Sequence, residues 1–139
     1  MKDTDKEKVV EAIRLAEAKT SGEIRVHINQ KMISNDVLAD AKKLFTELKM
    51  HHTKKRTGVL IYVVLAEKKF AVVGDKGINE VVPINFWEEV VVGMKYYLSK
   101  NDILEAVLHA VEKAGEQLKI YFPIKEDDIN ELTNEISEG

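Results

Sequence analysis

Oxygen-bearing side chains in three polar segments are the residues of this sequence best suited to chemistry. The segments span residues 20–23, 51–58 and 74–80, and a glutamate precedes the first of them at position 17. Hard divalent cations prefer all-oxygen ligand sets, and a bound ion removes the repulsion among gathered carboxylates. The candidate metal ligands are Glu17, Glu23, Asp75 and Asn79, and further candidate loop contacts are Thr20, Thr53, His52 and Lys76.

The elements that must position these segments alternate between helical and strand periodicity. Apolar residues recur at helical spacing over about 4–19, 37–48, 87–98 and 103–122. Residues 23–29 alternate polar and apolar, which predicts a half-buried strand with His27 on its polar face. The β-branched run 59–65 predicts a strand buried on both faces, and residues 70–73 predict a third strand in a hairpin with it. This order predicts an α/β fold with a small mixed sheet.

The predicted topology brings the three polar segments together. A helix joins the first two strands, so we expect them to be parallel, with the third strand antiparallel to the second. The first two strands then begin at the sheet edge where the third one ends. We call the three segments gathered there the polar edge. Ligands of open parallel sheets normally lie beyond the carboxyl ends of the strands, whereas the polar edge holds the amino ends of the first two.

Two other interpretations of the same residues remain open. Residues 20–22 could simply end a helix, and Asp75 could stabilise a turn through its own backbone. Alternatively, Asp75 or Glu23 could hold a metal while the basic run 54–56 faces a phosphate group. The sequence contains no P-loop and no Cys-x5-Arg motif, so it carries neither of these catalytic signatures for phosphoryl transfer.

Composition limits the class of protein. The chain has 139 residues, 45% of them hydrophobic and 32% charged, which fits one globular domain. A net charge of −3 argues against nucleic-acid binding, and the lack of cysteine excludes disulfides, thiolate catalysis and cysteine zinc sites. The N-terminus lacks a signal-like apolar region, and the longest apolar run is too short to span a bilayer. We therefore expect a cytoplasmic monomer without membrane insertion.

Several stretches resemble the TPM domain family: residues 17–26, 52–62 and 73–79, extended by Trp87, 122–123 and 130–132. This module is shared by a thylakoid acid phosphatase, a cyanobacterial photosystem II repair protein and a nematode acetylcholine-receptor accessory protein. The resemblance implies a three-layer α/β/α sandwich, and we expect it to contain four or five helices. It also implies divalent-cation binding, calcium especially, with magnesium possible as the cofactor instead, and weak phosphatase activity in some relatives.

Taken together, these features suggest a soluble bacterial TPM-like domain over residues 1–123, followed by a segment, 124–139, that carries six acidic residues and one lysine. Apolar residues repeat at helical spacing in that segment, so it could dock on the domain. The expected role is accessory or regulatory, through calcium binding at the polar edge and an unknown protein partner. The alternative is a weak metal-dependent acid phosphatase acting on phosphate monoesters.

Overall fold

The computed structural model describes residues 1–124 and 136–138. Within these ranges the chain forms five α-helices, a short 3-10 helix (η1) and four strands. In chain order they are α1 (Asp3–Glu17), β1 (Glu23–Asn29), α2 (Val37–Glu47), η1 (Met50–His52), β2 (Gly58–Val64), β3 (Lys69–Gly74), α3 (Lys76–Asn79), α4 (Phe86–Leu98), α5 (Ile103–Tyr121) and β4 (Ser137–Glu138).

The strands form one mixed sheet in the order β3-β2-β1-β4. β1 runs parallel to β2 and to β4, while β2 and β3 are antiparallel. The predicted directions of the first three strands are therefore confirmed. Two elements differ from the expectations: residues 76–79 form the short helix α3 where a loop was expected, and β4 adds a strand that the sequence pattern does not signal.

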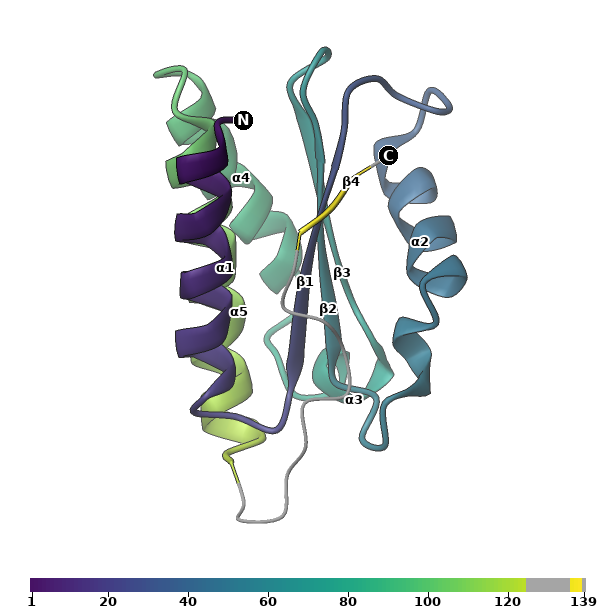
Figure 1. Ribbon diagram of the computed structural model, residues 1–139. Coiled ribbons are helices and arrows are strands. Elements are labelled where there is room, and N and C mark those ends of the chain that lie inside the picture. The colour runs from purple at the N-terminus through teal and green to yellow at the C-terminus, as the bar shows by residue number, and fades with distance from the viewer. Residues whose placement is uncertain (125–135, 139) are drawn as a thin grey trace.

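Helices cover both faces of the sheet, so the predicted three-layer α/β/α sandwich is confirmed. Figure 1 shows α1, α4 and α5 on one side of the sheet and α2 on the other. The larger core lies on the three-helix side, where Ile24, Val26 and Ile28 of β1 point. The smaller core lies on the α2 side and contains Tyr62 and Ala41. Each β2 residue is buried, as the continuous apolar run predicts.

One prediction about β1 is wrong. The alternating pattern indicated a half-buried strand, but six of its seven residues are buried, and His27 and Asn29 are each only 6% exposed. The reason is that neighbouring side chains cover them: the ring of Tyr62 stacks on His27 with a centroid distance of 5.7 Å, Asn29 contacts the Tyr62 hydroxyl, and Ser137 of β4 contacts His27. Polar side chains on this strand are therefore internal groups that need hydrogen-bond partners.

Aspartates cap the amino ends of the longer helices α2 and α5. Oδ1 of Asp36 accepts hydrogen bonds from the backbone N–H groups of Leu38 and Ala39, both at 3.1 Å. Oδ1 of Asp102 accepts one from Glu105 N at 3.0 Å, so both residues satisfy amides that the helix itself leaves unpaired. Within residues 1–124 and 136–138, none of the helices combines the length and the apolar character needed to cross a membrane.

Candidate functional site

Glu23 and Asp75 lie in one row across the sheet, on either side of Gly58. Glu23 pairs with Gly58 in the parallel β1–β2 ladder, and the backbone N–H of Asp75 donates to Gly58 O at 2.9 Å. Residues that are paired across strands share a face, so both carboxylate side chains lie on the α2 side. They are 2% and 5% exposed. The structure thus brings the three polar segments to one edge of the sheet.

The carbonyl oxygen of Met50 lies over the middle of this row. A Cβ atom added to Gly58 would stand only 3.0 Å from Met50 O, so the absence of a side chain at position 58 makes room for η1. We call the carboxylates of Glu23 and Asp75 and this carbonyl the oxygen row. Its members come from three elements that are far apart in sequence.

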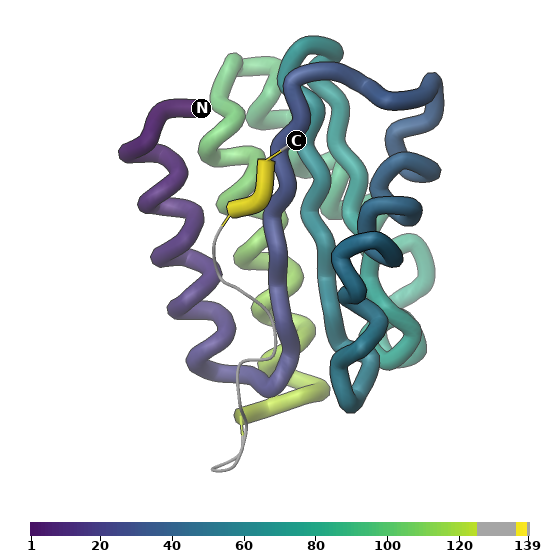
Figure 2. The backbone as a smooth tube through the Cα atoms, turned by 45° about the vertical axis from the view of Figure 1, so that its right-hand side comes forward, coloured from purple at the N-terminus to yellow at the C-terminus, as the bar shows by residue number. Residues whose placement is uncertain are grey.

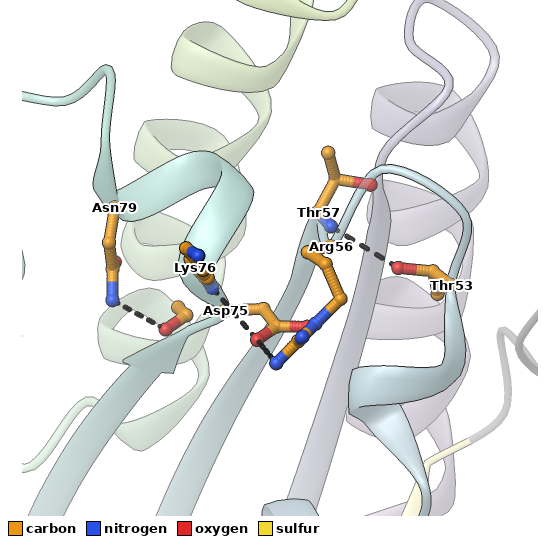
Figure 3. Close-up of polar contacts among 7 residues, drawn as sticks. Thr53, Arg56, Thr57, Asp75, Lys76 and Asn79 are labelled. Carbon is orange, nitrogen blue, oxygen red and sulfur yellow. Dashed lines mark hydrogen bonds and ion pairs between the residues drawn. The ribbon is translucent and has the colours of Figure 1, made fainter.

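Asp75 is held by an arginine in the loop before β2 (Figure 3). Arg56 donates from Nε to Oδ2 at 2.7 Å and from Nη2 to Oδ1 at 2.9 Å. Oδ1 also accepts the backbone N–H of Lys76 at 2.8 Å, which makes Asp75 the N-cap of α3. The hydrogen bonds from Arg56 to Asp75 raise the pKa of the guanidinium. The arginine side chain itself is 46% exposed.

A close backbone contact sets the position of this pair. Arg56 has a φ of 57°, and its carbonyl accepts the N–H of Gly77 at 2.8 Å. A Cβ atom at Gly77 would lie 2.0 Å from the carbonyl oxygen of Lys55, which no side chain could tolerate. Glycine at this position therefore lets α3 approach the 53–57 loop closely enough for Arg56 to reach Asp75.

Asn79 uses both ends of its amide within the fold. Nδ2 donates to Gly74 O at 2.7 Å, and Oδ1 accepts from the indole Nε1 of Trp87 at 2.6 Å. The residue therefore links the end of β3 to the first turn of α4. Asn79 was predicted as a metal ligand, but its amide oxygen faces the indole of Trp87 and not the carboxylates of the oxygen row.

Two further candidates tie α1 to its neighbours. Oε2 of Glu17, the last residue of α1, accepts the backbone N–H of Ile24 at 2.8 Å. Thr20 donates to Leu118 O at 3.0 Å and also contacts Phe122 O, and its Oγ1 accepts from Gly22 N at 3.0 Å. Both side chains are buried and join the α1–β1 turn to β1 or to the end of α5.

The remaining candidates divide between buried and exposed positions. Thr53 is buried, and its Oγ1 accepts the backbone N–H of Thr57 at 3.2 Å, which closes the loop before β2. His52 is exposed and contacts the ring of His51 edge-on. Lys76 is also exposed and offers Asp75 its backbone amide (Figure 3). Among the residues described, no three His, Asp or Glu side chains converge as a preformed metal site.

A depression beside Asp75 is lined by basic residues. Lys42 of α2, His51 of η1 and Arg56 line it together with Asp75, and Phe45 adds an apolar part to its wall. The Nδ1 atom of His51 is buried, and the described part of the chain offers it no hydrogen-bond partner. Two cationic side chains, Lys42 and Arg56, thus lie at the outer side of the oxygen row.

A second polar cluster, which sequence reasoning missed, lies toward the carboxyl ends of β1 and β2. Ser137 Oγ and His27 Nδ1 are 2.7 Å apart, His27 Nε2 and Asn29 Oδ1 are 2.9 Å apart, and Asn29 Nδ2 donates to Tyr62 Oη at 2.6 Å. Burial lowers the pKa of His27 and raises that of Tyr62. The pairing of β1 with β2 was a usable signal for this cluster. It sets His27 beside Tyr62, and Tyr62 lies on the strand that was predicted to be buried on both faces.

Sequence reasoning also missed the role of Arg56, which it placed in a basic run that could face a phosphate group. The hairpin register contains the signal. Val59 opposes Gly74, so the residues just outside this pair, Gly58 and Asp75, are neighbours. An arginine two residues before β2 can then reach an aspartate that directly follows β3.

Comparisons with known proteins identify the fold and the family. The structure is similar to the NMR structure of the BA42 protein from the psychrophilic bacterium Bizionia argentinensis, with a TM-score of 0.90 and 43% identity over 100% of this chain and 95% of that one. The N-terminal domain of a P. gingivalis protein shares the fold alone, with a TM-score of 0.70 and 16% identity over 88% of this chain and 78% of that one. No curated protein matches the sequence significantly. The TPM domain model matches residues 1–117, nearly all of the α/β/α sandwich that carries the polar edge, so the chain belongs to the TPM domain family.

Proposed function

We propose that this TPM domain is an accessory domain that binds a divalent cation, with calcium the first candidate, at the polar edge. The observation that carries the proposal is the oxygen row, in which two buried carboxylates flank a main-chain carbonyl. Calcium binds carboxylate and carbonyl oxygens in flexible arrangements. Asp75 already has a cationic partner in Arg56, so the ion would enter by replacing the guanidinium.

Exchange is physically reasonable because the two members of the ion pair differ in exposure. The side chain of Arg56 is nearly half exposed and can return to water, whereas that of Asp75 stays buried on the sheet. A cation at Asp75 would compensate the buried carboxylate in place of Arg56. Glu17 and Asn79, which hold backbone or indole groups, would support the loops around the ion.

Removing Arg56, which competes with the cation for Asp75, should raise the calcium affinity, and this gain tests the proposal. Arg56→Gln should bind calcium about tenfold more tightly than the wild type, since the ion no longer displaces a charged hydrogen-bonding group. Isothermal titration calorimetry measures the affinity, and the melting temperature of Arg56→Gln should rise with calcium. Asp75→Asn should abolish both effects. Lys55→Gln, a change at the exposed neighbouring residue, is the matched control and should behave as the wild type.

Calcium affinity that falls in Arg56→Gln, or that is unchanged in Asp75→Asn, would contradict the exchange. A lower affinity in Arg56→Gln would mean that Arg56 helps calcium to bind. An unchanged affinity in Asp75→Asn would mean that calcium binds away from Asp75. The same titration with magnesium tests cation choice, because magnesium demands a stricter octahedral geometry than calcium.

Hydrolysis of phosphate monoesters is the second candidate function. The basic depression formed by Lys42, His51 and Arg56 beside Asp75 favours it, because such side chains bind phosphate oxygens. The wild type should then hydrolyse p-nitrophenyl phosphate in a metal-dependent reaction, and Asp75→Ala should not. Equal rates for the two proteins would remove this function.

A further inference from the structure

The C-terminal strand β4 occupies the edge of β1 through a ladder of two residues. Its two residues, Ser137 and Glu138, pair in parallel with His27 and Ile28. Figure 2 shows the strand lying along β1, next to α1. Two residues are a short ladder for a β-strand, and a strand this short adds little stability by itself.

Alternating side chains of the tail meet three different surroundings. Ile136 packs on the larger core, on the side of α1. Ser137 points to the opposite face, where its Oγ lies 2.7 Å from His27 Nδ1 and 3.4 Å from Arg25 Nε. Glu138 returns to the first face and forms an ion pair with Lys6 of α1. We call this strip of the β1 edge, with Lys6, Arg25 and His27, the tail groove.

The charges of the tail groove suit an acidic segment. Lys6 lowers the pKa of Glu138, with a smaller contribution from the N-terminal amino group. Arg25 adds positive charge on the other face of the strand. A bound strand therefore meets an apolar contact, a hydroxyl-binding imidazole and a cationic position in succession, which is how strand addition to a sheet edge obtains specificity.

We propose that the tail groove is a docking site for an extended segment of a partner protein that carries an apolar residue, a hydroxyl residue and an acidic residue in succession. The segment of the partner adds to β1 in parallel and replaces the chain's own residues 136–138, which act as an internal competitor. The contacts of Ile136, Ser137 and Glu138 define the chemistry of the partner. This site is separate from the polar edge and does not depend on cation binding.

The internal competitor makes the proposal testable with the full-length chain. The probe is a fluorescent peptide with the sequence Asn-Glu-Ile-Ser-Glu-Gly, and the acceptor is the full-length Ser137→Pro variant, in which proline disrupts the short ladder. Fluorescence anisotropy should detect binding to Ser137→Pro. Binding to the wild type should be at least about tenfold weaker, since the tethered tail competes at a high effective concentration. Ser137→Ala, which removes only the hydroxyl group, should lie between the two.

Matched changes then test each part of the groove. A peptide with valine in place of its serine loses the hydrogen bond to His27, and one with glutamine in place of the glutamate after the serine loses the ion pair to Lys6. Both should bind several-fold more weakly. In the Ser137→Pro background Lys6→Ala should weaken binding, whereas Lys8→Ala, a change at an exposed lysine of the same helix, should not. Amide NMR shifts should change at His27 and Ile28.

Three results would overturn the proposal. One is no binding to a folded Ser137→Pro variant at several millimolar peptide. Another is equal binding to Ser137→Pro and the wild type, which would place the peptide elsewhere. The third is a wild-type dimer, detected by light scattering, that the peptide dissociates. In that case the occupant of the groove is a second copy of this chain and not a different partner.

Discussion

Arg56 and Asp75, separated by 19 positions in the sequence, form a two-point ion pair with N–O distances of 2.7 and 2.9 Å. The pair joins the loop before β2 to the first turn of α3, and the same aspartate caps that helix. A carboxylate that the sequence suggested as a metal ligand therefore already has a structural role. A cation that binds Asp75 therefore has to compete with Arg56.

Substitution of Asp75 should show both of its roles in the free energy of unfolding. Asp75→Ala removes the helix cap, which alone costs about 1 kcal/mol, and also removes the partner of Arg56. Asp36→Ala, which removes only the cap of α2, is the comparison and should cost less. Urea denaturation measures both variants. Equal losses would mean that the ion pair adds nothing to stability.

Substitution of Gly77 should be among the most damaging single changes at the polar edge. Gly77→Ala places a methyl group against the carbonyl of Lys55, so α3 has to move away from the 53–57 loop. We expect a loss of about 2–4 kcal/mol, in the range of severe steric substitutions. Lys76→Ala, a change at the exposed preceding residue, should cost well under that. A thermal melt of the two variants side by side decides the matter, and matching melting temperatures would contradict the contact.

Removal of the Thr20 hydroxyl should loosen the end of α5. Thr20→Val removes the hydroxyl contacts to Leu118 O and Phe122 O and leaves the buried Gly22 N–H without its acceptor, with an expected cost of about 1–3 kcal/mol. Amide hydrogen exchange should increase in the last turn of α5 before the rest of that helix. Thr46→Val, at an exposed helical position, is the control. Unchanged exchange at the end of α5 would show that Thr20 does not hold it.

Acidification should destabilise the protein through His27. Burial lowers the pKa of this imidazole, so the unfolded chain binds a proton more readily than the folded one. The resulting stability is present at pH values above the pKa of histidine in the unfolded chain, about 6.5. It is lost as the pH falls toward the lower pKa of His27 in the folded protein. Asn29, Tyr62, Arg25 and Glu138 face or surround the ring.

Melting temperatures between about pH 7.5 and 5 measure this effect, because carboxylates titrate mostly below that range. Hydrogen bonds from Ser34 lower the pKa of Asp40, and Lys6 lowers that of Glu138, so both groups contribute stability that is lost at more acidic pH. His27→Gln should flatten the curve above pH ~5. If the melting temperature of His27→Gln depended on pH as strongly as that of the wild type, another group would be responsible for the acid sensitivity.

Periodicity predicted most of the architecture. The continuous run 59–65 could only be a central strand, and the spacing of apolar residues located four of the helices within a few positions. The meeting of Glu23 with Asp75 at one edge followed from strand direction alone. The helices and strands can be found locally, because the apolar residues of a helix or a strand repeat with the same period wherever that element lies in the fold.

Three features escaped sequence reasoning because they depend on contacts between distant residues. Arg56 lies in a run of basic residues, and its pairing with Asp75 follows only from the hairpin register. His27 occupies a polar position in the alternating pattern of β1, which is typical of a surface residue, but Tyr62 and Ser137 cover it. The two residues of β4 are too few for any period to be visible.

The amino-acid order alone thus determined the four longer helices and the first three strands, because the pattern of apolar residues requires one buried side for each. Tertiary structure decided which polar side chains are internal and which partners they have. A carboxylate or an imidazole is compatible with solvent, an ion pair or a hydrogen bond, and only the elements that surround it exclude water and select one of these.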